Sequence, residues 1–295
     1  MRFTVPLLSV LGTALTAMSP LRAAESPPVT KPGIRELKLV TDIQAITPGK
    51  PFTIALVIDP QAGYHTYWRG PGIVGVATAM KWTLPEGFTA GAIQWPAPQK
   101  VNMAGITAYG YRERTLLLTK VTPPKEIAGN EVTLQVKCIW MACATSCNPG
   151  LAELSLTLPV QDTGKPEQPD AKVATEIEAV RTSLPPSAPS SWKIVVRSPS
   201  AVEIALEIEI PDLKIKDAES VYFYSDDMQV DSDEPQAISL DDAGRLQLRL
   251  VRPEFAPRSP DHLSGLLFCS QPWPGLNSHY VEISAPWPAG TFPHE

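Results

Sequence analysis

Three of the chain's four cysteines lie within ten residues of one another, in the segment CIWMACATSCNPG (138–150). Cys143 and Cys147 are four positions apart, and only small residues separate them. On one turn of helix this spacing places two side chains on the same face, with Cα atoms about 6 Å apart, within reach of a disulfide. A bond that closes so short a loop removes little chain entropy. The spacing therefore argues against a purely structural cross-link.

Three kinds of site are compatible with this pair: a redox-active dithiol, an inert local disulfide and a thiolate site for Cu(I). The redox pair is favoured because a small loop with small intervening residues suits a bond that opens and closes. Soft sulfur ligands select Cu(I), and Met141 and Met103 are candidates to assist Cys143 and Cys147. Zinc is disfavoured because it needs four ligands, and the chain's four histidines are scattered.

Cys138, the first cysteine of the segment, is expected to be buried. In EVTLQVKCIW (131–140) apolar and polar residues alternate, and Cys138 and Trp140 fall on the apolar face of a strand that we expect to end near Met141. A buried thiol there acts as a small hydrophobe. A disulfide between Cys138 and Cys269 is the minor alternative.

Residues 1–24 are typical of a secretory signal peptide. A basic start is followed by the apolar run VPLLSVLGTALTAM (5–18) and then by small residues at Ala23 and Ala24. An uncleaved anchor is the alternative, and no later stretch approaches the ~20 apolar residues of a membrane span. We therefore expect an exported protein with no membrane span in its mature chain, in a compartment where disulfides persist.

The composition narrows the class further. Of the 295 residues 19% are charged, and the net charge of −6 offers no basic surface for nucleic acid. The 32 prolines suit many short strands joined by turns. No nucleophile triad, Gly-rich phosphate loop or His-Glu-x-x-His motif is present. The acidic stretch SDDMQVDSDE (225–234) lacks the glycine and closing glutamate of a calcium loop, so we expect a solvated loop.

The pattern predicts an all-β chain of two β-sandwich domains joined by a linker with one short helix. The domains are expected at 25–160 and 191–295, and the linker at 161–190. Turn signals recur every eight to twelve residues, and Val173, Ile177 and Val180 repeat at helical spacing within 171–184. The expected strands are 36–45, 51–60, 79–84, 114–123, 131–140, 151–160, 191–198, 202–210, 220–225, 244–251, 264–270 and 279–286. Trp82, Trp95, Trp192, Trp273 and Trp287 are expected in cores or as loop anchors.

WMACATSCNPG (140–150) resembles the redox segment of the periplasmic N-terminal domain of the DsbD family, in particular its copper-sensitivity-suppressor (ScsB-like) members. Their pattern is Trp-x-x-Cys-x-x-x-Cys-x-Pro-Gly, and Trp140, Cys143, Cys147, Pro149 and Gly150 fill its fixed positions. Further similar segments occur in order along the chain. They are GYHTYWRGPG (63–72), WTLPEGF (82–88), IQWPAP (93–98), AYGY (108–111), LSGLLF (263–268) and YVEISAP (280–286).

The resemblance implies an immunoglobulin-like fold in a periplasmic protein, with a surface cysteine pair that needs no cofactor. It implies that Cys143 and Cys147 relay electrons between a thioredoxin-like protein and periplasmic thiol proteins. Cys147 is expected to form the mixed disulfide and Cys143 to resolve it. Full family members also contain a membrane domain and a thioredoxin-like domain, which this sequence lacks. A separately encoded membrane thiol reductase is therefore the expected electron source.

The resemblance also assigns the surroundings of the pair. Tyr64, His65 and Tyr67 lie where the family has aromatic residues beside the disulfide, and core or rim packing is the alternative for them. VNMAGITAYGY (101–111) matches a stretch that caps the disulfide in some members, with Met103 in place of the aromatic tip residue. The alternative function is a non-catalytic sandwich that holds Cu(I) or docks a protein.

Overall fold

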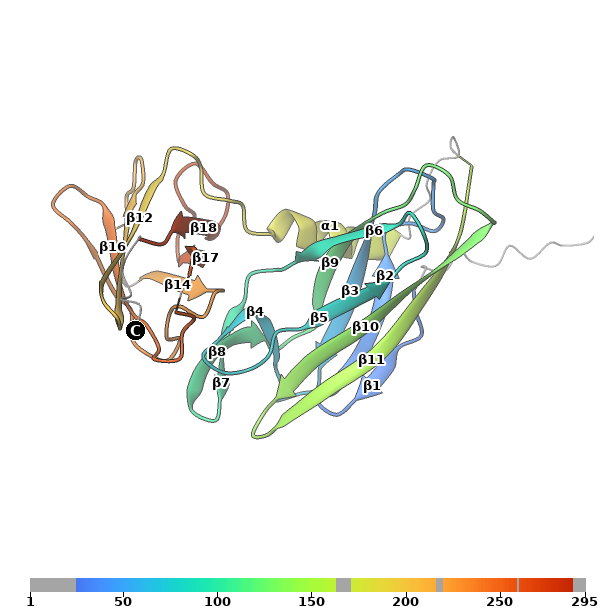
Figure 1. Ribbon diagram of the computed structural model, residues 1–295, viewed down its shortest axis with the longest axis horizontal. Coiled ribbons are helices and arrows are strands. Elements are labelled where there is room, and N and C mark those ends of the chain that lie inside the picture. Colours follow the sequence, from blue (N-terminus) through green and yellow to red (C-terminus); the bar gives the residue numbers. More distant parts are fainter. Residues whose placement is uncertain (1–24, 163–170, 216–219, 259, 289–295) are drawn as a thin grey trace, which may run out of the picture.

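The structure is a computed structural model that describes residues 25–162, 171–215, 220–258 and 260–288. The expected signal peptide (1–24) lies outside the described residues. The described chain consists of strands and a single helix, so the expected all-β class is confirmed (Figure 1). Within these residues, no helix is long and apolar enough to cross a membrane.

Strands β1–β11 form three sheets, which together with helix α1 we call the N-terminal sandwich. The largest sheet has the order β1 (Val29–Lys31), β2 (Ile34–Thr41), β3 (Phe52–Pro60), β9 (Thr115–Thr122), β6 (Thr89–Gln94). The second sheet has the order β11 (Cys147–Pro159), β10 (Glu131–Cys143), β5 (Ala79–Thr83). The third, which we call the junction sheet, has the order β4 (Thr66–Gly72), β8 (Ile106–Tyr111), β7 (Gln99–Met103).

The main core lies between the first two sheets. Alternate residues of β10, from Val132 to Trp140, are buried against alternate residues of β2 and β3, as the period of two in the sequence predicts. Strand β3 differs because all nine of its residues are buried. Both of its faces must therefore be covered.

Helix α1 (Ala171–Ser183) covers the second face of β3. Val173, Ile177 and Val180, which the sequence places on one helical face, pack on the outward side chains of β2, β3 and β9. Arg181 adds hydrogen bonds to Asp42 at 3.1 Å and to Thr53 Oγ1 at 2.8 Å. The helix was expected as part of a linker, but its apolar face makes it a layer of the N-terminal sandwich.

Strands β12–β18 form two more sheets, which we call the C-terminal sandwich. One has the order β12 (Lys193–Ser200), β13 (Glu203–Glu209), β16 (Leu246–Val251), β15 (Ala237–Leu240). The other has the order β14 (Val221–Ser225), β17 (His262–Cys269), β18 (Tyr280–Pro286). Trp192 and Trp273 meet edge-to-face in the core between them, with ring centroids 5.5 Å apart. Trp82 and Trp95 pack at the edge of the main core, and Trp287 at the edge of this one.

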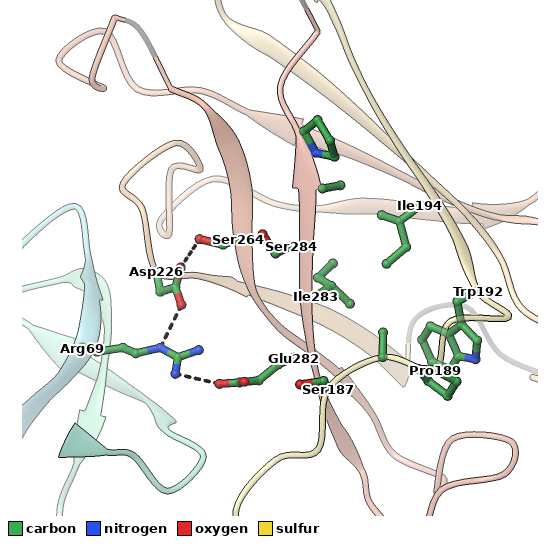
Figure 2. A pocket seen from close by; sticks show the side chains of 13 residues that line it. Arg69, Ser187, Pro189, Trp192, Ile194, Asp226, Ser264, Glu282, Ile283 and Ser284 are labelled. Carbon is green, nitrogen blue, oxygen red and sulfur yellow. Dashed lines mark hydrogen bonds and ion pairs between the residues drawn. The ribbon is translucent and has the colours of Figure 1, made fainter. Parts of the chain in front are cut away.

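The junction sheet is the part of the N-terminal sandwich that lies next to the C-terminal sandwich (Figure 1). None of its strands was expected from the sequence. The phenol oxygens of Tyr109 and Tyr222 lie 2.9 Å apart across the boundary. Arg69 donates hydrogen bonds to Asp226 at 2.8 Å and Glu282 at 2.7 Å, beside a hollow in the surface of the C-terminal sandwich (Figure 2).

The acidic stretch 225–234 contributes to this boundary, so the expectation of a solvated loop is wrong. Ser225, Gln229 and Ser232 are buried. The carboxylate of Asp227 accepts hydrogen bonds from the hydroxyl of Ser225 and the backbone N–H groups of Gln229 and Ser264. Internal hydrogen bonds of this kind fix the loop and let it pack against another surface.

Candidate redox site

Cys143 and Cys147 form a disulfide at the tip of the β10–β11 hairpin. They are directly opposed across the two strands, with Cα atoms 4.1 Å apart. The expected helical turn is therefore wrong, and β10 continues past Met141 to Cys143. A separation of four residues suits a three-residue hairpin loop as well as a helical turn, and here the strand pairing on both sides decides between them.

The same register explains the rest of the motif. Trp140 is paired with Gly150, and Met141 with Pro149. The Trp140 indole lies over Gly150 so closely that a Cβ at Gly150 would meet indole Cε2 at 2.1 Å. Pro149 is exposed on β11, an edge strand of its sheet among the described strands, where a missing N–H costs no ladder bond.

The disulfide faces away from the main core. Trp140 and Ala142 point into that core, whereas Cys143 belongs to a separate apolar cluster with Tyr67, Val101 and Ala108. Val74, Met103, Met141 and Cys147 are partly buried around it. The junction sheet therefore covers the disulfide, and we call this sheet the lid. Cys143 is 0% exposed, whereas Cys147 is only half-buried.

His65 attaches this lid to the hairpin. The backbone N–H of His65 donates to the backbone carbonyl of Cys143 at 2.9 Å, and the backbone N–H of Cys143 donates to the backbone carbonyl of His65 at 3.0 Å. The imidazole is buried, and its Nε2 has no hydrogen-bond partner among the described residues. Burial lowers the pKa of His65, and the nearby charge of Arg112 lowers it further. The ring is therefore neutral at neutral pH, and its main contribution is the backbone bridge.

Tyr67 is the residue of the lid that packs in the apolar cluster with Cys143. Its ring contacts His65 edge-to-face at 5.1 Å, and burial raises the pKa of its phenol to about 12. Gly75, at φ +102°, lies against the ring, and a Cβ there would fall 2.1 Å from Tyr67 Cε1. Tyr67 is thus a neutral, fixed surface rather than a proton donor.

Met103 forms the outer edge of the lid. It precedes a two-residue turn, Ala104 and Gly105 with φ of 51° and 95°, that joins β7 to β8 as a tight hairpin. Its Sδ lies 3.6 Å from Cys147 Sγ. Because a disulfide sulfur carries no proton, this is a sulfur–sulfur packing contact. The expected placement of a methionine over the pair thus agrees with the geometry.

The other expected neighbours lie elsewhere. Tyr64 packs on the main core beside Gly33 and Ala142, and Trp140 lies on the opposite face of β10. Val101 and Ala108 were not singled out as site residues. The signal that could have found them is the pair of short runs on either side of Ala104-Gly105, a spacing typical of a β-hairpin.

Cys138 and Cys269 are free and buried, each in the core of a different sandwich. The alternative disulfide between them is not formed. Burial raises the pKa of the Cys138 thiol to about 12, which keeps it protonated and unreactive. The expectation that Cys138 acts as a small buried hydrophobe is confirmed.

Comparison with known proteins agrees with this geometry. Residues 36–159 match the family model described as "Thiol:disulfide interchange protein DsbD, N-terminal". The N-terminal periplasmic domain of ScsB from Proteus mirabilis has a similar structure, with a TM-score of 0.61 and 16% sequence identity over 90% of this chain and 98% of that chain. No curated protein matches the sequence. The structural likeness shows a common fold, and the family match spans both cysteines.

Replacing Gly150 with Ala tests the role of the Trp140 contact. We expect a loss of about 1–3 kcal/mol in the free energy of unfolding, because the new methyl group must displace the indole. Gly91→Ala is the matched control, since its Cβ would meet nothing closer than a carbonyl at 3.5 Å. Chemical denaturation of both variants makes the comparison. Equal stability of the two variants would contradict this account of the motif.

Proposed function

We propose that the protein, whose residues 36–159 match the family model of the DsbD N-terminal domain, is a periplasmic thiol–disulfide exchange module. Electrons pass through Cys143 and Cys147, from a thioredoxin-like protein or a separately encoded membrane thiol reductase to periplasmic thiol proteins. The observation that carries the proposal is the asymmetry of the disulfide. Cys147 is a partly buried residue at the edge of the lid, and Cys143 is fully buried.

This asymmetry supports the expected order of attack, with Cys147 as the residue that is attacked first. A partner thiolate reaches Cys147 Sγ, forms a new disulfide with it and breaks the Cys143–Cys147 bond. Cys143 leaves with the electron pair and takes a proton. The partner's second thiolate then attacks the partner's own sulfur and releases Cys147, so the pair gains two electrons and two protons. Passing electrons to the next protein reverses these steps.

The hairpin makes the reaction reversible. After reduction, the strand pairing on both sides of the loop still holds the two cysteines opposite each other. The thiols remain neighbours, so re-forming the bond costs little chain entropy. The pair can therefore alternate between its two states without a change of fold.

The surface next to the disulfide indicates where a partner docks. Any partner that bonds to Cys147 must also cover the adjoining outer face of the hairpin. Near the tip, the cross-strand pairs on this face are apolar: Met141 with Pro149, and Ile139 with Leu151. Farther away they are polar, namely Lys137 with Glu153, Gln135 with Ser155 and Thr133 with Thr157. Leu151 is 49% exposed, which suits a protein partner with an apolar rim around its own cysteine.

Serine variants test the order of attack. The probe is a thioredoxin-like protein whose single active-site cysteine carries a thionitrobenzoate leaving group. Cys143→Ser keeps the accessible Cys147 and should release thionitrobenzoate at least about tenfold faster than Cys147→Ser, as expected when access controls reactivity. The double serine variant gives the background from Cys138 and Cys269. If Cys147→Ser reacts as fast as Cys143→Ser, the assignment is wrong; if neither exceeds the background, the proposed function fails.

A charge among the apolar residues near the hairpin tip tests the docking surface. We expect Leu151→Glu to lower kcat/KM with a thioredoxin-like protein about tenfold, because a carboxylate must be desolvated at the interface. Its reduction by dithiothreitol should be unchanged, since a small thiol needs no docking surface. Val202→Glu is the matched control, as Val202 is 53% exposed in the C-terminal sandwich. Equal losses in the two variants would contradict a docking role for Leu151.

A specific contact also favours a second function, the holding of Cu(I) by the reduced protein. Met103 Sδ already lies 3.6 Å from Cys147 Sγ, and Met141 belongs to the same cluster as both cysteines. Once the disulfide is reduced, two thiolates and a thioether form a donor set that suits Cu(I). The described residues contain no cluster of His, Cys, Asp and Glu that suits a harder metal.

Competition with the chelator bicinchoninate tests this second function. We expect the reduced protein to remove Cu(I) from the chelator and the oxidised protein not to, because the disulfide offers the metal no thiolate. Met103→Leu should weaken binding several-fold, whereas Met228→Leu, at an exposed site in the C-terminal sandwich, should not. Equal binding by the Cys143→Ser, Cys147→Ser double variant would exclude the site.

A further inference from the structure

Two side chains of the acidic stretch 225–234, Ser232 and Asp233, form hydrogen bonds to the backbone of the junction sheet. Ser232 is 3% exposed, donates its hydroxyl to the Thr107 carbonyl at 2.6 Å and accepts the Ile73 N–H at 3.0 Å. The Asp233 carboxylate accepts the Thr107 N–H at 2.8 Å. Both backbone groups of Thr107, a residue of the N-terminal sandwich, are thus bonded to the C-terminal sandwich.

Thr107 is close to the disulfide through its own hairpin. It lies in β8 next to Ala108, which is buried in the cluster around Cys143. The preceding residue, Ile106, is paired with Met103, the residue over Cys147. The hairpin therefore touches the disulfide on one side and the C-terminal sandwich on the other.

Two glycines show how closely the surfaces fit. A Cβ at Gly72 would fall 2.4 Å from Ser232 Oγ, and a Cβ at Gly70 would fall 2.3 Å from the Cα of Asp226. Only glycine lets the backbone of β4 approach the loop so closely. The approach allows the short hydrogen bonds of Ser232 to form.

Other contacts across the boundary hold the junction sheet in the same position. Lys100 Nζ, on β7, lies 3.3 Å above the ring of Tyr222. Arg69, on β4, binds Asp226 and Glu282 (Figure 2). Of the junction-sheet residues in these contacts, Thr107, which binds Ser232 and Asp233, is nearest in sequence to the Ala104-Gly105 turn.

We propose that Ser232 and Asp233 are positioning residues for the disulfide: by holding Thr107, the C-terminal sandwich keeps Met103 closed over Cys147 and limits how fast a thiol attacks it. The proposal rests on exchange at Cys147 as the proposed function, and it gives the C-terminal sandwich a part in that reaction. Releasing the hairpin opens the lid without changing the cysteines.

Reduction by dithiothreitol tests the proposal without a protein partner. One dithiothreitol thiolate attacks Cys147 Sγ and displaces Cys143, which takes a proton. The second thiolate closes the dithiothreitol ring and releases Cys147, so the reagent is oxidised and the pair reduced. The rate is followed by acid quenching, alkylation and mass spectrometry. Because no partner is involved, failure here is distinct from failure of exchange with thioredoxin-like proteins.

We expect the Ser232→Ala, Asp233→Ala variant to be reduced several-fold faster than the unaltered protein. Asp233→Asn keeps an oxygen that can accept the Thr107 N–H. It should therefore be reduced at nearly the rate of the unaltered protein, unlike Asp233→Ala. Ser239→Ala, Asp242→Ala is the matched control, with both side chains exposed in the same sandwich. Should the double variant not fold, Asp233→Ala alone gives the test, because Asp233 is exposed.

A Met103→Ala variant separates a positioning role from a general loss of stability. It should accelerate reduction by itself, and adding Ser232→Ala, Asp233→Ala should give little further gain, because both changes remove the same barrier. Fully additive effects would overturn the proposal. So would an unchanged rate in a folded Ser232→Ala, Asp233→Ala variant.

Discussion

The antiparallel register of β10 and β11 is the constraint on which the site depends. It places Cys143 opposite Cys147, and with the same offset it places Trp140 opposite Gly150. The indole needs the space that a glycine leaves, so the motif's fixed residues are parts of one hairpin. A shift of either strand by one residue would turn that strand's cysteine toward the main core, where the Cys138 thiol is buried and protonated, and the two cysteines would no longer be opposed. The register thus decides which face of the hairpin carries the disulfide.

The junction sheet packs against the tip of this hairpin and covers the disulfide. Its inner side chains enclose Cys143, while Met103 leaves Cys147 half-buried. The sheet is held from both sides, by the backbone bridge of His65 to Cys143 and by the loop 225–234 of the C-terminal sandwich. Under our proposal, access to Cys147 depends on contacts from both the N-terminal and the C-terminal sandwich.

The sequence was sufficient for features that depend on local periodicity. The buried face of β10, the small-hydrophobe role of Cys138 and the helix around Ile177 all follow from alternation or helical spacing. The Cys143–Cys147 segment was wrongly predicted to be a helical turn, because a separation of four residues suits both a helix and a hairpin. The loop 225–234 was mistaken because its partners, Thr107 and Arg69, lie more than a hundred residues away in the chain. Composition shows that a loop is polar, but it does not show whether water or another part of the protein forms hydrogen bonds with its polar groups.

The reduction potential of the Cys143–Cys147 pair tests the central claim most directly. The purified protein is equilibrated in glutathione or dithiothreitol buffers, and free thiols are counted by mass spectrometry. An exchange module predicts a potential between about −120 and −270 mV, the range of known exchange catalysts. A potential below about −300 mV, typical of structural disulfides, would contradict the account and make the pair a cross-link of the hairpin.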